Sequence, residues 1–354
     1  VVPLVFCSLV CGSMSIGDTK KLGTVGVRTL VFYLATTALA VSVALTVGNL
    51  INPGVGLDMS SIQSSASSVE TMEATSLTDT ILNIIPDNPI NSLASGTMLQ
   101  VIVFALIVGV ILAKMGERAE TVANFFSQFN DIMMEMTMMI MALAPIGVFC
   151  LLCPVIAANG PAIIGSLAMV LLAAYICYVV HAVVVYSLTV RTLGGLSPLK
   201  FFKGMLPAIM FAFSSASSVG TLPINLECTE KLGAKREIAS FVLPLGATIN
   251  MDGTAIYQGI CAIFIASCYG IHLTLSQMLT IVLTATLASI GTAGVPGAGM
   301  VMLAMVLTSV GLPVDGIALV AGVDRIFDMG RTTVNITGDA ACTCLLYTSP
   351  SPRD

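Results

Sequence analysis

Apolar stretches of about 20 residues, the length that an α-helix needs to cross a bilayer, recur along this chain. Only 9% of the 354 residues are charged, against roughly 25% in a soluble domain. Inside a bilayer the backbone polar groups have to be satisfied within the chain, which favours helices. The sequence therefore predicts an all-α polytopic membrane protein, with apolar stretches near 24–50, 98–114, 132–157, 161–190, 237–270, 274–290 and 300–321.

The distribution of basic residues predicts how the chain is oriented. Lysine and arginine lie in or beside short connections, as at Lys20, Lys114 and Lys200, whereas the long connection 51–97 has neither and carries acidic residues instead. Cytoplasmic loops of membrane proteins are enriched in Lys and Arg. We therefore expect the basic connections on the cytoplasmic side of the cell membrane and the segment 51–97 outside.

A stripe of polar residues lies inside the last apolar region. At about 100° per residue, a helix places the whole stripe within about 60° of Asp328. A charge at the bilayer centre costs roughly 2.5–3.5 kcal/mol on insertion scales, so the stripe has to face protein, water or a ligand. Internal ion pairs that only hold helices together are one interpretation. Three acids and an amide on one face favour a site for cations and a charged solute. The stripe consists of Asp324, Asp328, Arg331, Thr332, Asn335 and Asp339.

Two pairs of interrupted segments form an internal repeat. Small polar residues interrupt one apolar region at 214–223, and Asn250-Met-Asp-Gly-Thr254 follows it. Glycines and a proline interrupt another at 289–299, and the region around Asp328 follows that. Interrupted segments in corresponding positions of two halves are the best sequence indication of the binding site of a secondary transporter. Each unit is predicted to be a broken hairpin followed by a helix with acid and amide groups.

The interruptions supply groups that suit a charged solute and a counter-ion. Hairpin tips rich in Ser and Gly expose backbone N–H groups, which bind carboxylates. Carbonyl groups freed near Gly246, Thr248 and Asn250 suit a hard cation such as sodium, which prefers oxygen ligands. A pair of kinked helices without a ligand would explain either half of the repeat alone, but it is a poor explanation of both.

These motifs resemble those of the dicarboxylate/amino acid:cation symporters, the family that contains the glutamate transporters. Members of this family are among the transporters from which the rule on interrupted segments was drawn, so the two inferences are not independent. The resemblance covers about residues 1–343. It rests on the serine-rich segment ending Gly-Thr-Leu-Pro223, on Asn250–Thr254, on Gly291–Gly299, and on Asp328–Thr332 with Asn335 and Asp339.

The resemblance implies a symporter that couples sodium entry to uptake of L-aspartate or L-glutamate. It implies a homotrimer in which a transport domain slides past a fixed scaffold as an elevator. Expected partners are the amino acid, sodium ions and membrane lipids, without an organic cofactor, nucleic acid or enzymatic activity. The expected N-terminal segments are the end of the second helix at 1–17, with the first helix missing, a transport-domain helix at 18–50, an external loop at 51–79 and scaffold helices at 80–157. The rest of the transport domain is expected at 158–343, with hairpin 1 (203–228), a broken helix (236–270), hairpin 2 (274–310) and the last helix (313–343). Residues 344–354 are expected to be a foreign tail.

The resemblance also assigns substrate contacts. Arg331 matches the arginine that pairs with a side-chain carboxylate, a role that the planar guanidinium suits chemically. Asp328 matches the carboxylate that receives the α-ammonium group of the substrate. The α-carboxylate contacts match Asn335, Ser217 and Ser218, and the remaining substrate contacts match Thr254, Val295, Gly299 and Thr332.

Three sodium sites are implied in the same way. The first matches Gly246, Asn250, Asn335 and Asp339. A deeper one matches Tyr33, Thr36, Thr37, Asn250 and Asp252. A third, beside the second hairpin, matches Thr248, Ser289 and Thr292.

Two positions depart from the family pattern. Some members carry an arginine in the first hairpin, where this chain has Ala216, and others carry one beside the family aspartate, where it has Met329. Arg325 lies one helical turn before Met329 and is the candidate to supply this charge.

Alternatives within the family and outside it stay open. The acidic stripe could bind protons in place of sodium, although the hydroxyl-rich set around Thr36 favours sodium. A neutral amino-acid carrier would have little use for Arg331, and a C4-dicarboxylate carrier would have little use for Asp328. Aspartate and glutamate differ by one methylene group, so the sequence does not separate them.

Other classes of protein fit the sequence less well. A channel would need a continuous polar pore, whereas the polar residues concentrate in one cluster. A membrane enzyme would need a nucleophile–base pair or a cluster of metal ligands, and none stands out. His181 and His272 are isolated in the sequence and indicate no metal site.

Overall fold

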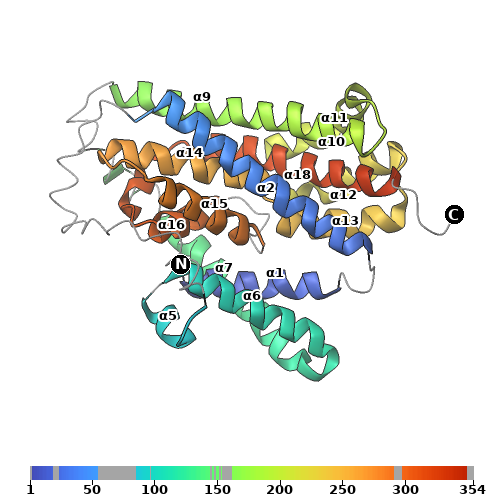
Figure 1. Cartoon of the computed structure of the whole chain (residues 1–354), viewed down its shortest axis with the longest axis horizontal. Helices are drawn as coiled ribbons and strands as arrows, with labels where there is room; N and C mark the ends of the chain where they lie inside the picture. The colour runs from blue at the N-terminus through green and yellow to red at the C-terminus, as the bar shows by residue number, and fades with distance from the viewer. Residues whose placement is uncertain are drawn as a thin grey trace.

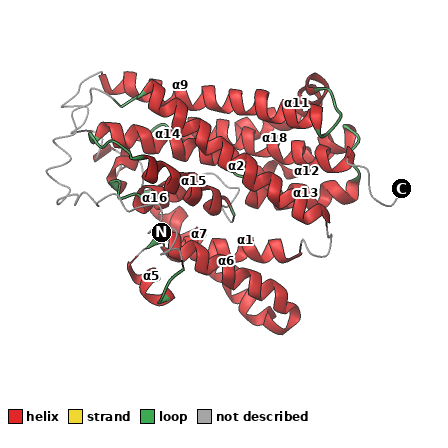
Figure 2. Cartoon of the chain, in the orientation of Figure 1, coloured by secondary structure: helices red, strands yellow, loops and turns green. Residues whose placement is uncertain are grey.

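The computed structural model describes residues 2–18, 24–54, 85–95, 97–143, 146, 149–150, 153, 162–290 and 297–348. Within these ranges every regular element is a helix and none is a strand (Figure 2). The prediction of an all-α chain is therefore confirmed for the described residues.

Long apolar helices account for most of the predicted membrane stretches. Among the described residues, the segments long and apolar enough to cross a membrane are Gly26–Ile51, Gln100–Met133, Ile164–Thr192 and Ile238–Cys268. The stretches predicted at 274–290 and 300–321 instead form α15 (Leu275–Ser289) and α16 (Ala298–Ser309), of 15 and 12 residues. Both are shorter than the roughly 20 residues that a crossing requires. Much of the stretch predicted at 132–157 lies outside the described residues.

One side of the molecule is a layer of helices from the N-terminal half (Figure 1). Within it, α1 packs against both α6 and α7, and α5 contacts α6. The close approach of α1 and α6 depends on Gly109, because a Cβ there would collide with the Ser13 side chain. The layer consists of α1 (Val2–Asp18), α5 (Pro89–Ser95), α6 (Met98–Met115), the 3₁₀ turn η2 (Gly116–Ala119) and α7 (Glu120–Ala142).

The larger region contains the long helix α2 (Thr24–Ile51) and a rod that begins with α9 (Ala162–Val180). The rod continues through a π-helical turn, η3 (His181–Tyr186), into α10 (Ser187–Thr192). In Figure 1 the rod runs along the edge opposite the α1–α6–α7 layer. Within an 18-residue apolar window of Ile238–Cys268, 94% of the residues are buried, whereas 28–39% are buried in the corresponding windows of the other membrane-length segments. That segment is therefore the centre of the core.

The first predicted interruption is a helical hairpin. α11 (Pro198–Ser215) and α12 (Ser218–Lys231) pack against each other across a two-residue connection. Ala216 takes a left-handed conformation with φ of 53°, and the Ser217 side chain accepts a hydrogen bond from Gly220 N at 3.0 Å. A left-handed residue followed by an N-cap ends one helix and starts the next.

The helix that follows this hairpin is broken in the middle. α13 (Arg236–Ile249) ends and α14 (Asp252–Cys268) begins around Asn250 and Met251, whose backbone is non-helical. Non-helical backbone at membrane depth is tolerated where protein or a water-filled cavity satisfies it. Here the amide of Asn335 accepts a hydrogen bond from the Gly253 N–H at 2.7 Å.

The C-terminal helix α18 (Asp324–Thr348) passes through this core. It contacts α11, α12, α13 and α14 as well as α2 and α9. The η4 turn (Val314–Gly316) and α17 (Ile317–Ala321) precede it. The helix was predicted to end at 343, but it continues to Thr348 and buries Cys344, Leu345 and Leu346.

Candidate functional site

The polar stripe of α18 faces the interior of the molecule. Asp328, Arg331 and Asp339 are only 3%, 2% and 1% exposed, whereas Ile326 on another face is 45% exposed. Counting histidine as neutral, the buried charged residues in the described part of the chain are four carboxylates and one guanidinium. This leaves a formal excess of three negative charges, which is costly in a low-dielectric interior unless cations or protons offset it.

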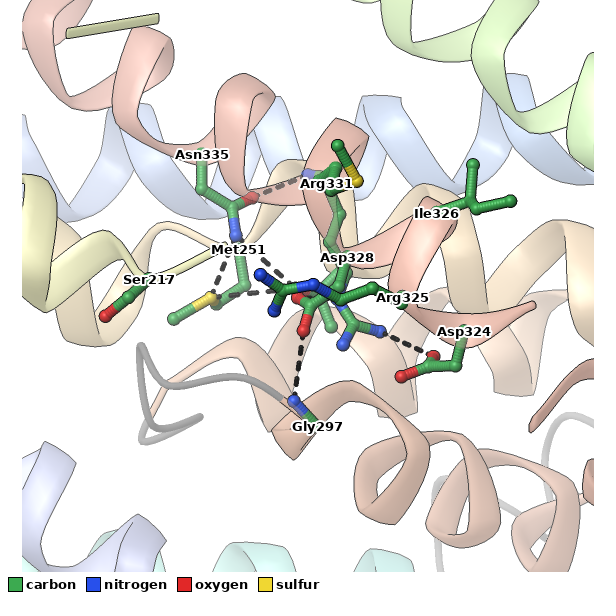
Figure 3. Close-up of polar contacts among 12 residues, drawn as sticks. Ser217, Met251, Gly297, Asp324, Arg325, Ile326, Asp328, Arg331 and Asn335 are labelled. Atoms are coloured by element: carbon green, nitrogen blue, oxygen red, sulfur yellow. Dashed lines mark hydrogen bonds and ion pairs between the residues drawn. The ribbon is translucent and has the colours of Figure 1, made fainter. Parts of the chain in front are cut away.

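Arg331 lies between two carboxylates of its own helix (Figure 3). Its Nε donates to Asp328 Oδ1 at 2.7 Å, and its Nη1 donates to Asp324 Oδ1 at 3.3 Å. The guanidinium carbon lies 4.9 Å from the centroid of the Tyr257 ring. Arg331 Nη2 is buried and has no hydrogen-bond partner among the described residues. The arginine therefore has a free, desolvated donor that can receive another carboxylate.

The second interrupted segment also reaches this cluster. Gly297 N donates to Asp328 Oδ2 at 3.1 Å, so the end of the α15–α16 connection touches the same aspartate (Figure 3). A Cβ at Gly299 would collide with Arg331 Nη1. Glycine at 299 thus allows α16 to approach the guanidinium. Val295 and Thr292 lie outside the described residues.

Asn335 connects the stripe to the break between α13 and α14. Its Oδ1 accepts from Gly253 N, and its Nδ2 lies 3.2 Å from Met251 Sδ and 3.4 Å from Thr254 Oγ1. Thr254 and Thr332 are each 4% exposed. Four of the predicted substrate contacts, Asn335, Thr254, Thr332 and Arg331, are therefore buried along the line where α18 meets α14.

The first hairpin borders the same site through its tip. Ser218 is buried, and the Ser217 side chain caps α12. Arg325 Nη2 donates to the carbonyls of Ser214 and Ser215 at 3.1 and 3.3 Å, and thereby ties α18 to the end of α11. Arg325 is exposed and lies beside the Asp328–Arg331 cluster in Figure 3.

Another buried carboxylate, Asp339, lies about three turns beyond Asp328 on α18. Asn250 Nδ2 donates to Asp339 Oδ1 at 2.8 Å and to the Asn335 carbonyl at 3.0 Å. Asn250 Oδ1 is buried without a hydrogen-bond partner in the described part of the chain. A Cβ at Gly246 would collide with Asp339 Oδ1, so the broken helix and α18 meet closely here. The structure thus brings together all four residues predicted for the first sodium site.

The deeper predicted site is centred on Asp252, which is fully buried. Asp252 Oδ1 accepts from Thr37 Oγ1 at 2.6 Å and from Thr36 Oγ1 at 3.2 Å. Tyr33 is also buried, but its hydroxyl donates to the Val242 carbonyl at 3.1 Å. The structure therefore brings the two threonines directly onto the carboxylate and places Tyr33 against the broken helix.

Two residues that the sequence did not indicate complete the surroundings of Asp252. His181 Nε2 lies 3.1 Å from Asp252 Oδ2, and the Tyr186 hydroxyl donates to the same oxygen at 2.8 Å. His181 is isolated along the sequence, but the fold brings it next to Asp252. His181 and Tyr186 are five residues apart, a spacing that an α-helical pattern does not place on one face.

The third predicted sodium site is not assembled by contacts among the described residues. The Thr248 and Ser289 hydroxyls each donate to a carbonyl of their own helix, at 2.9 and 2.7 Å. No hydrogen bond joins these two residues in the part of the chain that the structure describes. Its third member, Thr292, lies outside that part.

The family model for the sodium:dicarboxylate symporter family matches residues 1–349. This chain belongs to that family. The match extends past the predicted boundary at 343, in agreement with the continuation of α18 to Thr348.

Over the aligned residues, relatives in this family are about a third identical to the chain. A "proton/glutamate-aspartate symporter" of Escherichia coli (strain K12) is 38% identical over 348 residues, which cover 96% of this chain and 79% of the relative. A "proton/sodium-glutamate symport protein" of Geobacillus stearothermophilus is 36% identical over 351 residues, or 98% and 83% of the two proteins. "Excitatory amino acid transporter 2" of Homo sapiens is 32% identical over 403 residues, or 98% and 70%. The chain is a membrane transporter of this family and not an enzyme.

Proposed function

We propose that this symporter couples sodium entry to the uptake of L-aspartate or L-glutamate. The observation that carries the proposal is the buried Arg331, whose Nη2 has no partner among the described residues and lies beside two carboxylates. A guanidinium that is shielded from water and still has a free donor suits a ligand with a carboxylate on its side chain. The names of the bacterial relatives, which are glutamate and glutamate-aspartate symporters, support the same class of substrate.

The substrate would lie between α18, the break before α14 and the tips of the two hairpins. Arg331 would pair with the side-chain carboxylate and Asp328 would receive the α-ammonium group. The α-carboxylate would be bound by Asn335 with Ser217 and Ser218. Thr254, Val295, Gly299 and Thr332 would make the remaining contacts.

Sodium is the coupling ion that the buried groups fit best. The excess of buried carboxylates among the described residues requires positive charge. Asn250 Oδ1, which has no hydrogen-bond partner in the same part of the chain, offers an oxygen ligand of the kind that hard cations prefer. The threonine hydroxyls on Asp252 add further oxygen atoms. We assign one ion to Gly246, Asn250, Asn335 and Asp339, a second to Tyr33, Thr36, Thr37, Asn250 and Asp252, and a third to Thr248, Ser289 and Thr292.

Protons are the second candidate for the coupling ion. The name of the Escherichia coli relative specifies a proton, and that of the Geobacillus stearothermophilus relative specifies both ions. A buried carboxylate can take up a proton as well as bind a cation. The hydroxyl and amide oxygens around Asp252 and Asp339 favour sodium, because a proton needs no such ligand set.

Transport would follow an elevator mechanism in a homotrimer. The α1–α6–α7 layer would be part of the fixed scaffold. The helices around α14 and α18 would form the moving domain, and the α11–α12 and α15–α16 pairs would be re-entrant hairpins. The shortness of α15 and α16 supports this assignment, since neither can cross a bilayer alone.

The test is uptake of radiolabelled L-aspartate into proteoliposomes under an imposed sodium or proton gradient, with L-glutamate, L-serine and succinate as competitors. We expect sodium-driven uptake that glutamate blocks and that serine and succinate do not. Proton-driven uptake would overturn the coupling ion. Competition by serine would contradict the role of Arg331, and competition by succinate would contradict that of Asp328.

A further inference from the structure

The carboxylate of Asp252 is surrounded by polar side chains of this chain. Thr37 donates to Oδ1 at 2.6 Å, and Tyr186 donates to Oδ2 at 2.8 Å. The Thr36 hydroxyl lies 3.2 Å from Oδ1 and equally far from the Tyr33 carbonyl, so it can donate to either. His181 Nε2 lies 3.1 Å from Oδ2, in position to donate to it. A carboxylate offers about four lone-pair positions, and four side chains of this chain lie within hydrogen-bond distance of its two oxygens.

The π-helical turn η3 is what directs His181 and Tyr186 to the same oxygen. In an α-helix, residues five apart point about 140° away from each other. The wider π turn, with hydrogen bonds from i to i+5, stacks such residues, and turns of this kind are frequent at functional sites. The two rings meet edge to face with centroids 5.0 Å apart. Gly338 leaves room for the tyrosine, because a Cβ there would lie 2.6 Å from the Tyr186 hydroxyl.

The groups that contact Asp252 Oδ1 and those that contact Oδ2 differ in whether they can turn their hydrogens away from a bound cation. A threonine hydroxyl is both a donor and an acceptor, so Thr36 and Thr37 can rotate their hydrogens away and present lone pairs to an ion at Oδ1. The Tyr186 hydroxyl is also a donor and an acceptor, but it lies on Oδ2 and not on the oxygen that would receive the ion, and the imidazole N–H beside it has no such alternative. Oδ2 therefore stays hydrogen-bonded to η3 while Oδ1 exchanges hydroxyl hydrogens for a cation.

We infer that His181 and Tyr186 are positioning residues that stabilise Asp252 as a buried carboxylate during the return of the unloaded carrier. The inference rests on the proposed sodium symport, since a symporter completes its cycle only if it can cross the membrane without its ions. A bound cation withdraws negative charge from the carboxylate. The hydrogen bonds to Oδ2 are therefore stronger without the ion than with it, because hydrogen bonds to a full charge are the strong ones.

This inference predicts that one mode of transport is slowed and another is not. Net sodium-driven uptake requires the unloaded carrier to return, whereas exchange of internal for external L-aspartate in saturating sodium does not. Tyr186→Phe removes only the hydroxyl. We expect it to slow net uptake about tenfold and to leave exchange within about twofold of the wild-type rate. The sodium concentration for half-maximal exchange should fall about three- to tenfold, since the ion-free state loses the stronger hydrogen bond.

Three further variants, at two residues, separate this role from a general loss of folding or activity. Tyr178→Phe, on α9, is the matched control, because the Tyr178 hydroxyl is buried and has no hydrogen-bond partner among the described residues. It should change neither mode. His181→Gln keeps an N–H donor and His181→Leu removes it. We expect the leucine variant to behave like Tyr186→Phe and the glutamine variant to restore net uptake.

Each outcome decides between the proposals. A wild-type protein that shows neither sodium-driven uptake nor exchange would overturn the proposed function and this inference together. A working wild type with variants in which net uptake and exchange fall equally would overturn only the inference. A rise in the half-saturating sodium concentration would overturn it as well, because His181 and Tyr186 would then support the ion-bound state.

Discussion

Asp328 and Asp252 are both buried carboxylates, but the chain balances their charges differently. Asp328 lies 2.7 Å from the guanidinium of Arg331, which carries a full positive charge. Asp252 is surrounded by three hydroxyl groups and an imidazole. An ion pair with a spare donor suits a solute that brings charges of both signs. A carboxylate whose threonine neighbours can reverse their hydrogen bonds suits a cation. The comparison predicts that some substitutions weaken the binding of the solute and others weaken the binding of the ion.

The largest effect is expected from Arg331→Ala. It would leave Asp324 and Asp328 without their partner, and breaking a buried ion pair in this way typically costs about 3–5 kcal/mol. We expect at least about a hundredfold loss of L-aspartate affinity and a lower unfolding temperature in detergent. Arg331→Lys keeps the charge but loses the planar fork, so it should recover stability more than affinity. Wild-type affinity in the alanine variant would contradict the role of Arg331.

Gly299→Ala tests the same cluster from the side of α16. The added methyl group would collide with Arg331 Nη1, and overpacking of a buried site costs about 1–3 kcal/mol. We expect a roughly tenfold to hundredfold loss of uptake. Gly165→Ala is the control, because a Cβ there has no neighbour within 4 Å. Equal effects of the two substitutions, measured as uptake per folded transporter, would argue against close contact at Gly299.

A smaller and more selective effect is expected from Asp252→Asn. The amide keeps the size of the side chain but removes the charge that a cation would bind. We expect the half-saturating sodium concentration to rise about tenfold or more, and L-aspartate affinity to recover at high sodium. Asp328→Asn should instead weaken L-aspartate binding at every sodium concentration. If both variants responded to sodium in the same way, the two carboxylates would not have separate roles.

The smallest effect is expected outside the core, at the surface pair of Lys231 and Glu227. A hydrogen bond from the Lys231 ammonium, and its charge, lower the pKa of the Glu227 carboxyl. A lowered pKa contributes stability above the pKa of the unfolded carboxyl group, and this contribution is lost as the pH falls through the folded value. The side chains are 72% and 64% exposed, so solvent screens the pair. Lys231→Ala should leave the unfolding temperature unchanged at neutral and acidic pH.

The helical period of the polar residues and the positions of helix-breaking residues were enough to predict the helical class and the inward-facing stripe of α18. The polar residues of the stripe recur with the period of an α-helix, and the structure buries Asp328, Arg331 and Asp339 together. Small residues and a proline marked the interruptions near Ser217 and Asn250, because such residues stop helices. The proposed roles of these residues remain predictions that transport measurements have to test.

The surroundings of Asp252 could not be predicted from sequence, because they depend on a π turn. His181 and Tyr186 have no common face in an α-helical pattern, and both lie more than 60 residues from Asp252 in the chain. The pairing of Asp324 with Arg331 is different, because the two lie seven residues apart on α18 and the period of the helix already placed them on one face. Contacts across the fold, unlike periodicity, leave no local signal.

The most direct test of the account is calorimetric titration of L-aspartate into the purified transporter at stepwise increasing sodium concentrations, with choline holding the ionic strength constant. Coupled binding is reciprocal, so sodium that binds Asp252 and Asp339 has to tighten the binding of the amino acid at Arg331. We predict that L-aspartate affinity rises steeply with sodium until it saturates. An affinity that is independent of sodium at constant pH would contradict sodium coupling and leave the buried carboxylates to protons.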